Sequence, residues 1–168
     1  PEWQKIFLNS QTDNKAAFLS IYGSNPDLMK DVDPKKIMRF QKAANESISK
    51  YHDSLMANKN AWCVSAVPTL AWAKKLFPDL SEETAVTALW DHILKSSRIN
   101  QNPIESWKDH IKNLGKSIKF LNDYRFKALK FKSKSGTNLY VKLPDNHVWL
   151  GGTEMTPEGV EFAANIPT

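Results

Sequence analysis

The sequence predicts an α/β fold, in which a parallel β-α-β unit is followed by an antiparallel β segment that begins a second domain. Two short apolar runs, residues 16–23 and 61–67, flank a long amphipathic helical pattern, as in a β-α-β unit. From about residue 123 the hydrophobic period changes to the alternation of a strand. A chain of 168 residues is long enough to bury a hydrophobic core.

The first predicted strand ends at the turn residues Gly23-Ser24-Asn25-Pro26. Asp33 can cap the helix predicted over 34–57, and Pro34 suits its first position because no partner is needed there for an N–H. One apolar stripe marks the buried face of this helix: Ile37, Phe40, Ala44, Ile48, Tyr51 and Leu55. The second strand closes at Pro68, and a helical crossover predicts that the two strands are parallel.

Three further helices are predicted between the second strand and residue 122. The first spans 70–77 and stops before Pro78, and the second is capped by Ser81 with acidic residues in its first turn. The third opens at Asn102-Pro103, with Glu105 at capping-box spacing. Its apolar stripe is the clearest in the chain: Ile104, Trp107, Ile111, Leu114, Ile118 and Leu121.

The last part of the chain is predicted to form β structure. Residues 128–144 alternate apolar and polar side chains about Ser135-Gly136, which predicts an antiparallel hairpin. Residues 147–152 and 159–165 predict two more short strands around the turn "TPEG". We therefore expect two incomplete domains, an amino-terminal α/β domain over 1–122 and the β-rich start of a second domain over 123–168.

The residues offer no complete catalytic constellation. The single cysteine, Cys63, cannot form an internal disulfide, and its apolar run "AWCVSAV" predicts a buried, inert thiol. No H-E-x-x-H, G-x-S-x-G, Walker A or dinucleotide glycine pattern is present, and no apolar run is long enough to span a membrane. The four histidines and the three carboxylates considered as metal ligands are expected to be structural or exposed: His52, His92, His110, His147, Glu154, Glu158 and Glu161. We therefore expect no catalytic, cofactor-binding or metal-binding residue in this segment.

The stretch "RFKALKFKSK" (125–134) interleaves cations with Phe126 and Phe131, a pattern that single-strand nucleic-acid binders use. The strand period gives a simpler account, in which Phe131 points inward and the lysines keep a solvated edge from aggregating. The net charge of +5 permits weak nucleic-acid binding, and we expect no specific binding. Two hypotheses stay open from the residues alone, a binding module that uses the basic hairpin and an enzyme whose reactive groups lie elsewhere.

Three stretches carry a resemblance to a known family: "WCVSAVPTLAWAKKLFPDLSEETAVTALWDHIL", "SWKDHIKNLGKSIKFLNDYRFKALKFKSKSGTNLYVKLPDNHVWLGG" and "GVEFAANIPT". Their order and spacing over 61–168 resemble the metallo-aminopeptidases of the aminopeptidase S and aminopeptidase T type, a thermophilic-type metalloprotease family. The likeness is weaker in "SNPDLMKDVDPKKIMRFQKA".

This resemblance implies a cytoplasmic, homodimeric peptidase that removes N-terminal residues from peptides with two divalent metal ions, zinc, cobalt or magnesium. It places the first metal ligand, a glutamate, directly after the segment that here reads "NIPT". No family ligand matches a position in this chain. We therefore expect a fragment that lacks most of the catalytic domain, is inactive alone and holds no metal pair.

Overall fold

The computed structural model describes residues 2–164 and divides them into two compact units. The sheet unit comprises the residues up to Pro103 and those from Thr153 onward, and the hairpin unit is Ile104–Gly152. The elements of the sheet unit are α1 (Glu2–Asp13), β1 (Phe18–Tyr22), α2 (Pro34–Ser47), α3 (Ser49–Met56), β2 (Trp62–Ala66), α4 (Leu70–Leu76), α5 (Glu82–Ser96), β5 (Glu154–Met155) and β6 (Glu161–Phe162). The hairpin unit holds α6 (Pro103–Tyr124), β3 (Ala128–Lys132) and β4 (Asn138–Lys142). These units reflect packing, and the domain boundary at 122/123 stays a prediction.

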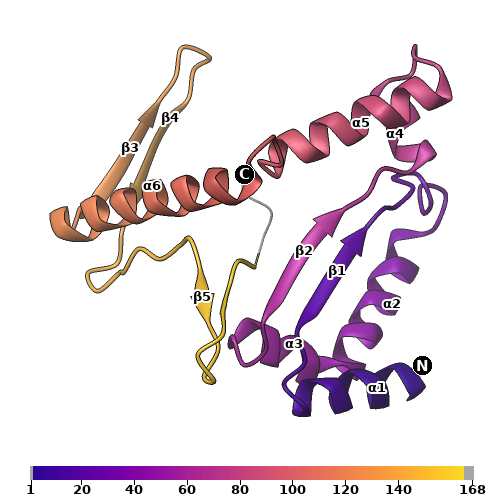
Figure 1. Ribbon diagram of the computed structural model, residues 1–168, viewed down its shortest axis with the longest axis horizontal. Helices are drawn as coiled ribbons and strands as arrows, with labels where there is room; N and C mark the ends of the chain where they lie inside the picture. The colour runs from indigo at the N-terminus through magenta and orange to yellow at the C-terminus, as the bar shows by residue number, and fades with distance from the viewer. Residues whose placement is uncertain (1, 165–168) are drawn as a thin grey trace. The chain divides into compact units, whose positions relative to one another are not determined.

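The predicted parallel pairing is confirmed. β1 and β2 lie side by side in a parallel register that runs from Phe18 opposite Trp62 to Tyr22 opposite Ala66 (Figure 1). The prediction of one long helix between these strands is wrong in one respect. The segment forms two helices, α2 and α3, which are separated at Ile48. The Ile48 N–H bonds to the Asn45 carbonyl, three residues back, at 3.3 Å, which tightens the last turn of α2 and ends it. The predicted cap is present, since the Asp33 carboxylate accepts the Lys35 N–H at 2.9 Å.

The chain begins with a helix, α1, that the sequence pattern did not predict. α1 ends in a Schellman motif, in which N–H groups beyond the helix bond to carbonyls of its last turn. The Ala16 N–H donates to the Gln11 carbonyl at 3.0 Å, and the Lys15 N–H donates to the Thr12 carbonyl at 3.1 Å. Such an ending needs a left-handed residue, usually glycine, and here Lys15 takes that place with φ +58°. The usual glycine stop signal is therefore missing from the sequence.

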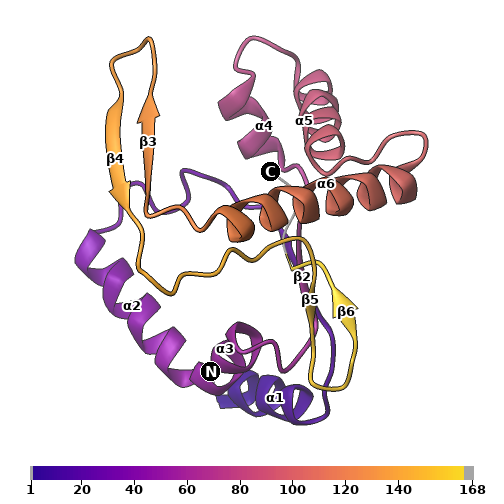
Figure 2. The same cartoon turned by 90° about the vertical axis from the view of Figure 1, so that its left-hand side faces the viewer.

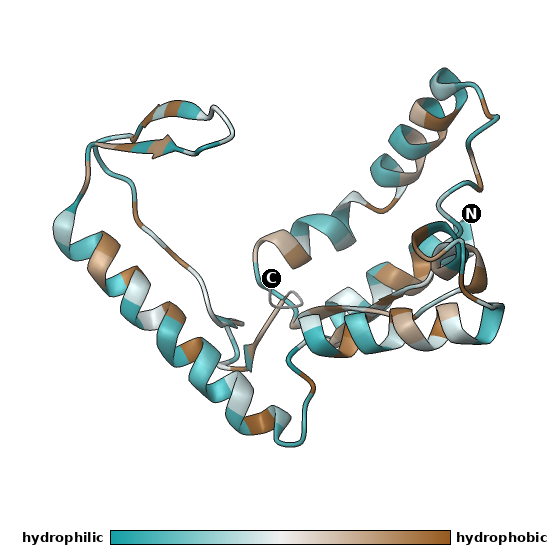
Figure 3. Cartoon of the chain, turned by 90° about the horizontal axis from the view of Figure 1, so that it is seen from above, coloured by the Kyte–Doolittle hydropathy of each residue, from teal (hydrophilic) through white to brown (hydrophobic). Residues whose placement is uncertain are grey.

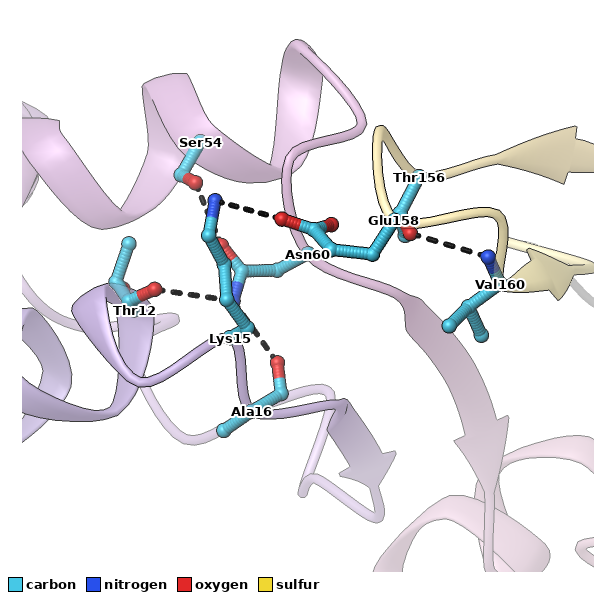
Figure 4. A network of polar contacts seen from close by, with 8 residues as sticks. All are labelled: Thr12, Lys15, Ala16, Ser54, Asn60, Thr156, Glu158 and Val160. Carbon is cyan, nitrogen blue, oxygen red and sulfur yellow. Dashed lines mark hydrogen bonds and ion pairs between the residues drawn. The ribbon is translucent and has the colours of Figure 1, made fainter.

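A buried amide joins α1, α3 and the start of the sheet (Figure 4). Asn60 is 1% exposed, and its Nδ2 donates to the Thr12 carbonyl at 3.2 Å and to the Ala16 carbonyl at 3.0 Å. Its Oδ1 accepts the Ser54 hydroxyl at 2.6 Å. Because a buried amide is costly unless it is hydrogen-bonded, these three contacts fix where two helices end relative to the sheet.

The most buried apolar cluster of the sheet unit lies between α4 and α5. Ala73 and Ala85 are fully buried, and Leu89 and Ile93 are nearly so. The two alanines let the helices approach closely, and Ala66 at the end of β2 packs against the cluster. The predicted cap of α5 is confirmed, since the Ser81 hydroxyl accepts the Thr84 N–H at 3.3 Å. This cluster anchors the helices that follow β2.

In the hairpin unit, the predicted long helix and the β3–β4 hairpin are both present. Apolar residues recur along α6 (Figure 3). The prediction of a strand over 147–152 is wrong. A side chain hydrogen-bonds the backbone N–H and carbonyl that would otherwise pair with a neighbouring strand. Asn122 accepts the Trp149 N–H at 2.9 Å and donates to the Trp149 carbonyl at 3.0 Å.

Two glycines then let the same segment lie against α6. A Cβ placed on Gly151 would lie 3.4 Å from the Ile118 side chain. Gly152 has φ +92°, a conformation that suits glycine alone among common residues. The end of the hairpin unit is thus held to its helix by backbone contacts rather than by a strand ladder.

β5 and β6 form a small antiparallel hairpin in the sheet unit (Figure 2). The predicted "TPEG" turn is confirmed, with the Thr156 N–H bonded to the Val160 carbonyl at 3.0 Å and Gly159 at φ +83°. Of the strand predicted over 159–165, only Glu161–Phe162 has strand geometry, and residue 165 lies outside the described residues.

Replacing Asn60 should destabilise the chain more than replacing an exposed hydrogen-bonding residue. Asn60→Ala leaves two backbone carbonyls and the Ser54 hydroxyl without their partner, so we expect the free energy of unfolding to fall by about 2–4 kcal/mol. Urea unfolding followed by circular dichroism measures this change. The matched control is Ser47→Ala on exposed α2, for which we expect a change within about 0.5 kcal/mol. Equal effects of the two substitutions would contradict the role given to Asn60.

Candidate functional site

The three candidate carboxylates all lie on or beside the β5–β6 hairpin, and each has a partner. The Asn58 side chain donates to Glu154 Oε2 at 3.0 Å, and the Thr153 hydroxyl donates to Glu161 Oε1 at 2.6 Å. Lys15 Nζ lies 3.1 Å from Glu158 Oε1. The structure therefore uses these carboxylates to hold the hairpin in place.

Two of those partners are the left-handed residues that end helices. Lys15 follows α1 with φ +58°, and Asn58 follows α3 with φ +53°. Each therefore turns the chain at a helix terminus and also contacts the β5–β6 hairpin through its side chain. Figure 4 shows the Lys15–Glu158 pair beside the Asn60 network.

The ion pair with Lys15 changes the acidity of Glu158. The hydrogen bond from Lys15 is the main cause that holds the pKa of Glu158 below its usual range, and a bond to its own backbone N–H adds to it. The Lys15 contact therefore stabilises the charged form of the Glu158 carboxyl, whereas a general acid needs a raised pKa.

The histidines do not converge on a site. His92 stacks on Phe77 with ring centroids 5.6 Å apart, and His52 lies against Tyr51. His147 Nδ1 is 2.6 Å from the Pro144 carbonyl, while His110 lies edge-on to Trp107. Over residues 2–164, no three side chains of His, Cys, Asp or Glu come together as a metal site would require.

The face of the β1–β2 sheet that carries Cys63 is open, and the predicted buried thiol is wrong. Cys63 is exposed and lies opposite Leu19, which is 62% exposed. Residues directly opposite in a pair of strands share a face. A hollow of about 280 Å³ lies on this part of the sheet, lined by Ala17, Phe18, Leu19, Ala61, Trp62, Cys63, Phe162 and Ala163. The apolar run of β2 is thus half-covered, since the helices bury only part of it.

The segment after β6 reaches the free edge of β2. The Val64 N–H donates to the Ala164 carbonyl at 3.1 Å, while β1 occupies the other edge of β2. Residues 162–164 therefore lie against β2. They lead into "NIPT", whose residues lie outside the described part of the chain. This edge, with residues 162–164 beside it, is the candidate functional site of the chain.

The family model described as thermophilic metalloprotease (M29) matches residues 1–168, the whole chain. The chain belongs to this family. It is 40% identical to aminopeptidase AmpS of Bacillus subtilis (strain 168) and 44% identical to aminopeptidase 2 of Geobacillus stearothermophilus. These alignments cover 100% and 91% of this chain but 41% and 37% of the relatives, so the chain spans about two fifths of their length.

A solved structure supports the same fold for this M29 chain. The wild-type AmpT structure from Thermus thermophilus superposes with a TM-score of 0.89 at 32% identity, and the match covers 100% of this chain and 41% of that one. The α/β fold and the family resemblance seen in the sequence are therefore both confirmed. Within residues 2–164 of this M29 chain, no helix combines the length and the apolar character that a membrane span needs.

Lys15→Met should raise the pKa of Glu158 toward the ordinary value of 4.5, because the substitution removes the cation that lowers it. The ion pair contributes stability above that ordinary pKa and loses it as the pH falls through the lowered pKa of Glu158. The stability difference between the wild-type chain and the variant should therefore shrink at acid pH. An NMR titration of the Glu158 carboxyl carbon measures the shift, and Lys42→Met on α2 is the matched control. An unchanged Glu158 midpoint in Lys15→Met would refute the assignment.

The exposed Cys63 should react with a thiol reagent in the folded chain. Because its side chain is exposed on the open sheet face, we expect Ellman's reagent to modify one thiol per chain without denaturant. Absorbance of the released thionitrobenzoate measures the reaction, and Cys63→Ser should release none. A thiol that reacts only after urea is added would show that the sheet face is covered.

Proposed function

We propose that the protein containing this chain is a metal-dependent aminopeptidase that removes N-terminal residues from peptides. The observation that carries this proposal is the family match over all 168 residues. Two relatives at 40% and 44% identity are named aminopeptidases, which supports the same reaction here. Peptide hydrolysis by two divalent metal ions, zinc, cobalt or magnesium, is part of the proposal, as are a homodimer and a cytoplasmic location.

The role proposed for this chain is structural. The residues from 123 onward begin a second domain in this proposal, and β2 holds the backbone of that part of the chain at Ala164. The three candidate carboxylates are engaged with Asn58, Lys15 and Thr153, so we assign no metal ligand within the chain. We propose accordingly that these 168 residues alone do not cleave peptides.

The longer natural polypeptide should release N-terminal residues from an unblocked peptide, while the 168-residue chain should release none. A chelator should abolish the activity of the longer polypeptide, and added divalent metal should restore it, because the metal ions would activate water and polarise the scissile carbonyl. Chromatography of the products from an unblocked peptide and its N-acetylated form measures the reaction.

The N-acetylated peptide is the control, since an aminopeptidase needs a free amino terminus. Equal cleavage of both peptides would contradict an aminopeptidase, and activity that survives the chelator would contradict a metal-dependent one. Cleavage by the 168-residue chain itself would contradict the structural role proposed for it.

A further inference from the structure

The β3–β4 hairpin concentrates the positive charge of the chain. Residues 125–142 contain six cations and no acidic residue, so the other residues together carry about −1 of the net +5. The six cations are all exposed: Arg125, Lys127, Lys130, Lys132, Lys134 and Lys142. In the part of the chain that the structure describes, the ion pairs involve other lysines, so these cations are not neutralised internally. An unneutralised patch of one sign favours an anionic partner.

The strand register sorts the hairpin into two faces. Lys130 lies opposite Tyr140, and Ala128 lies opposite Lys142, on one face. Phe131 lies opposite Leu139 on the other face, and both are about half exposed, at 49% and 51%. The prediction that Phe131 points inward is therefore wrong, because about half of its side chain is exposed.

This separation disfavours single-stranded nucleic acid as the partner. Binding of single strands needs aromatic rings and cations on one surface, so that bases stack while phosphates pair. Of the aromatic residues in β3 and β4, Phe131 lies on the face opposite to Lys130 and Lys132, because side chains alternate along a strand, and Tyr140 alone shares the lysine face, which leaves a single ring for successive bases to stack on. The same alternation suits an extended peptide, whose own side chains also alternate between two faces.

The outer edge of the hairpin can pair with such a peptide. The Leu143 N–H bonds to the Lys127 carbonyl at 2.9 Å, and the Ser133 N–H bonds to the Thr137 carbonyl at 3.1 Å. In an antiparallel ladder every second residue bonds to the partner strand, and the residues that alternate with them turn their backbone groups outward. On β4 those residues are Asn138, Tyr140 and Lys142, and β4 has no second strand partner within the described chain.

We propose that the β3–β4 hairpin binds an extended acidic peptide segment, which adds as a third strand along β4. Its carboxylates would lie beside Lys142 of β4, on the face that also holds Lys130 and Lys132 of β3, and its apolar residues would extend the face that holds Leu139 and Val141. Main-chain hydrogen bonds would supply affinity, and the lysines would select acidic sequences. This interaction goes beyond the proposed peptidase activity, and its test measures binding rather than turnover.

The test is fluorescence anisotropy of the 168-residue chain with a labelled, N-acetylated peptide of alternating Glu and Val. We expect this peptide to bind at least about tenfold more tightly than the matching Lys and Val peptide. Lys130→Glu with Lys132→Glu should weaken binding at least about tenfold. The matched control, Lys35→Glu with Lys36→Glu on α2, makes the same change in net charge, and we expect an effect within about twofold.

A peptide that is N-methylated at alternate residues separates strand pairing from simple charge attraction. It keeps every carboxylate but cannot form the ladder, so its binding should fall at least about tenfold. Equal binding of the methylated peptide, or equal effects of the two double variants, would overturn the proposal. It would also be overturned by tighter binding to an oligothymidine of equal charge or to phosphatidylserine vesicles. Dimerisation through the hairpin, or loss of peptide binding in the longer natural polypeptide, would likewise overturn it.

Discussion

The buried side-chain amide of Asn60 is the contact on which the sheet unit depends. It hydrogen-bonds the carbonyls of Thr12 and Ala16, where α1 ends and the chain turns toward β1, and it accepts the Ser54 hydroxyl near the end of α3. The two carbonyls lie 48 and 44 residues from Asn60 in the chain, whereas Ser54 lies 6 residues from it. A water molecule could satisfy each group separately, but only a single amide ties the two helices and the strand entry together in one geometry.

Around this amide, two helix endings serve a second purpose. Lys15 and Asn58 both adopt left-handed backbone conformations, where glycine would be more usual. Glycine would end the helices equally well, but it has no side chain with which to contact Glu158 or Glu154. The left-handed backbone at Lys15 and Asn58 therefore goes together with side-chain contacts to the β5–β6 hairpin that glycine could not make.

That hairpin leads to the free edge of β2, where the residues that follow it contact the strand. The Ala164 carbonyl is bonded to Val64, and β2 itself is fixed through Ala66 against the α4–α5 cluster. The carboxylates near this edge are occupied in structural contacts, one of them with a lowered pKa. The hairpin unit, in contrast, has an unneutralised basic surface and an open strand edge, which are features of a binding surface rather than a reactive one.

The sequence by itself determined the fold class, the parallel β-α-β unit, the helix α6, the β3–β4 hairpin and the family. These features follow from local periodicity, capping residues and motif order, all of which can be recognised without information on distant contacts. Only the tertiary structure decided that α1 exists, that Asn60 is buried, and that Cys63 and Phe131 are exposed. An apolar residue in a strand reports a preference for burial, whereas its actual burial depends on whether another element covers that face. Likewise, the partners of Glu154 and Glu158 lie 96 and 143 residues away in the chain, beyond the reach of any local pattern.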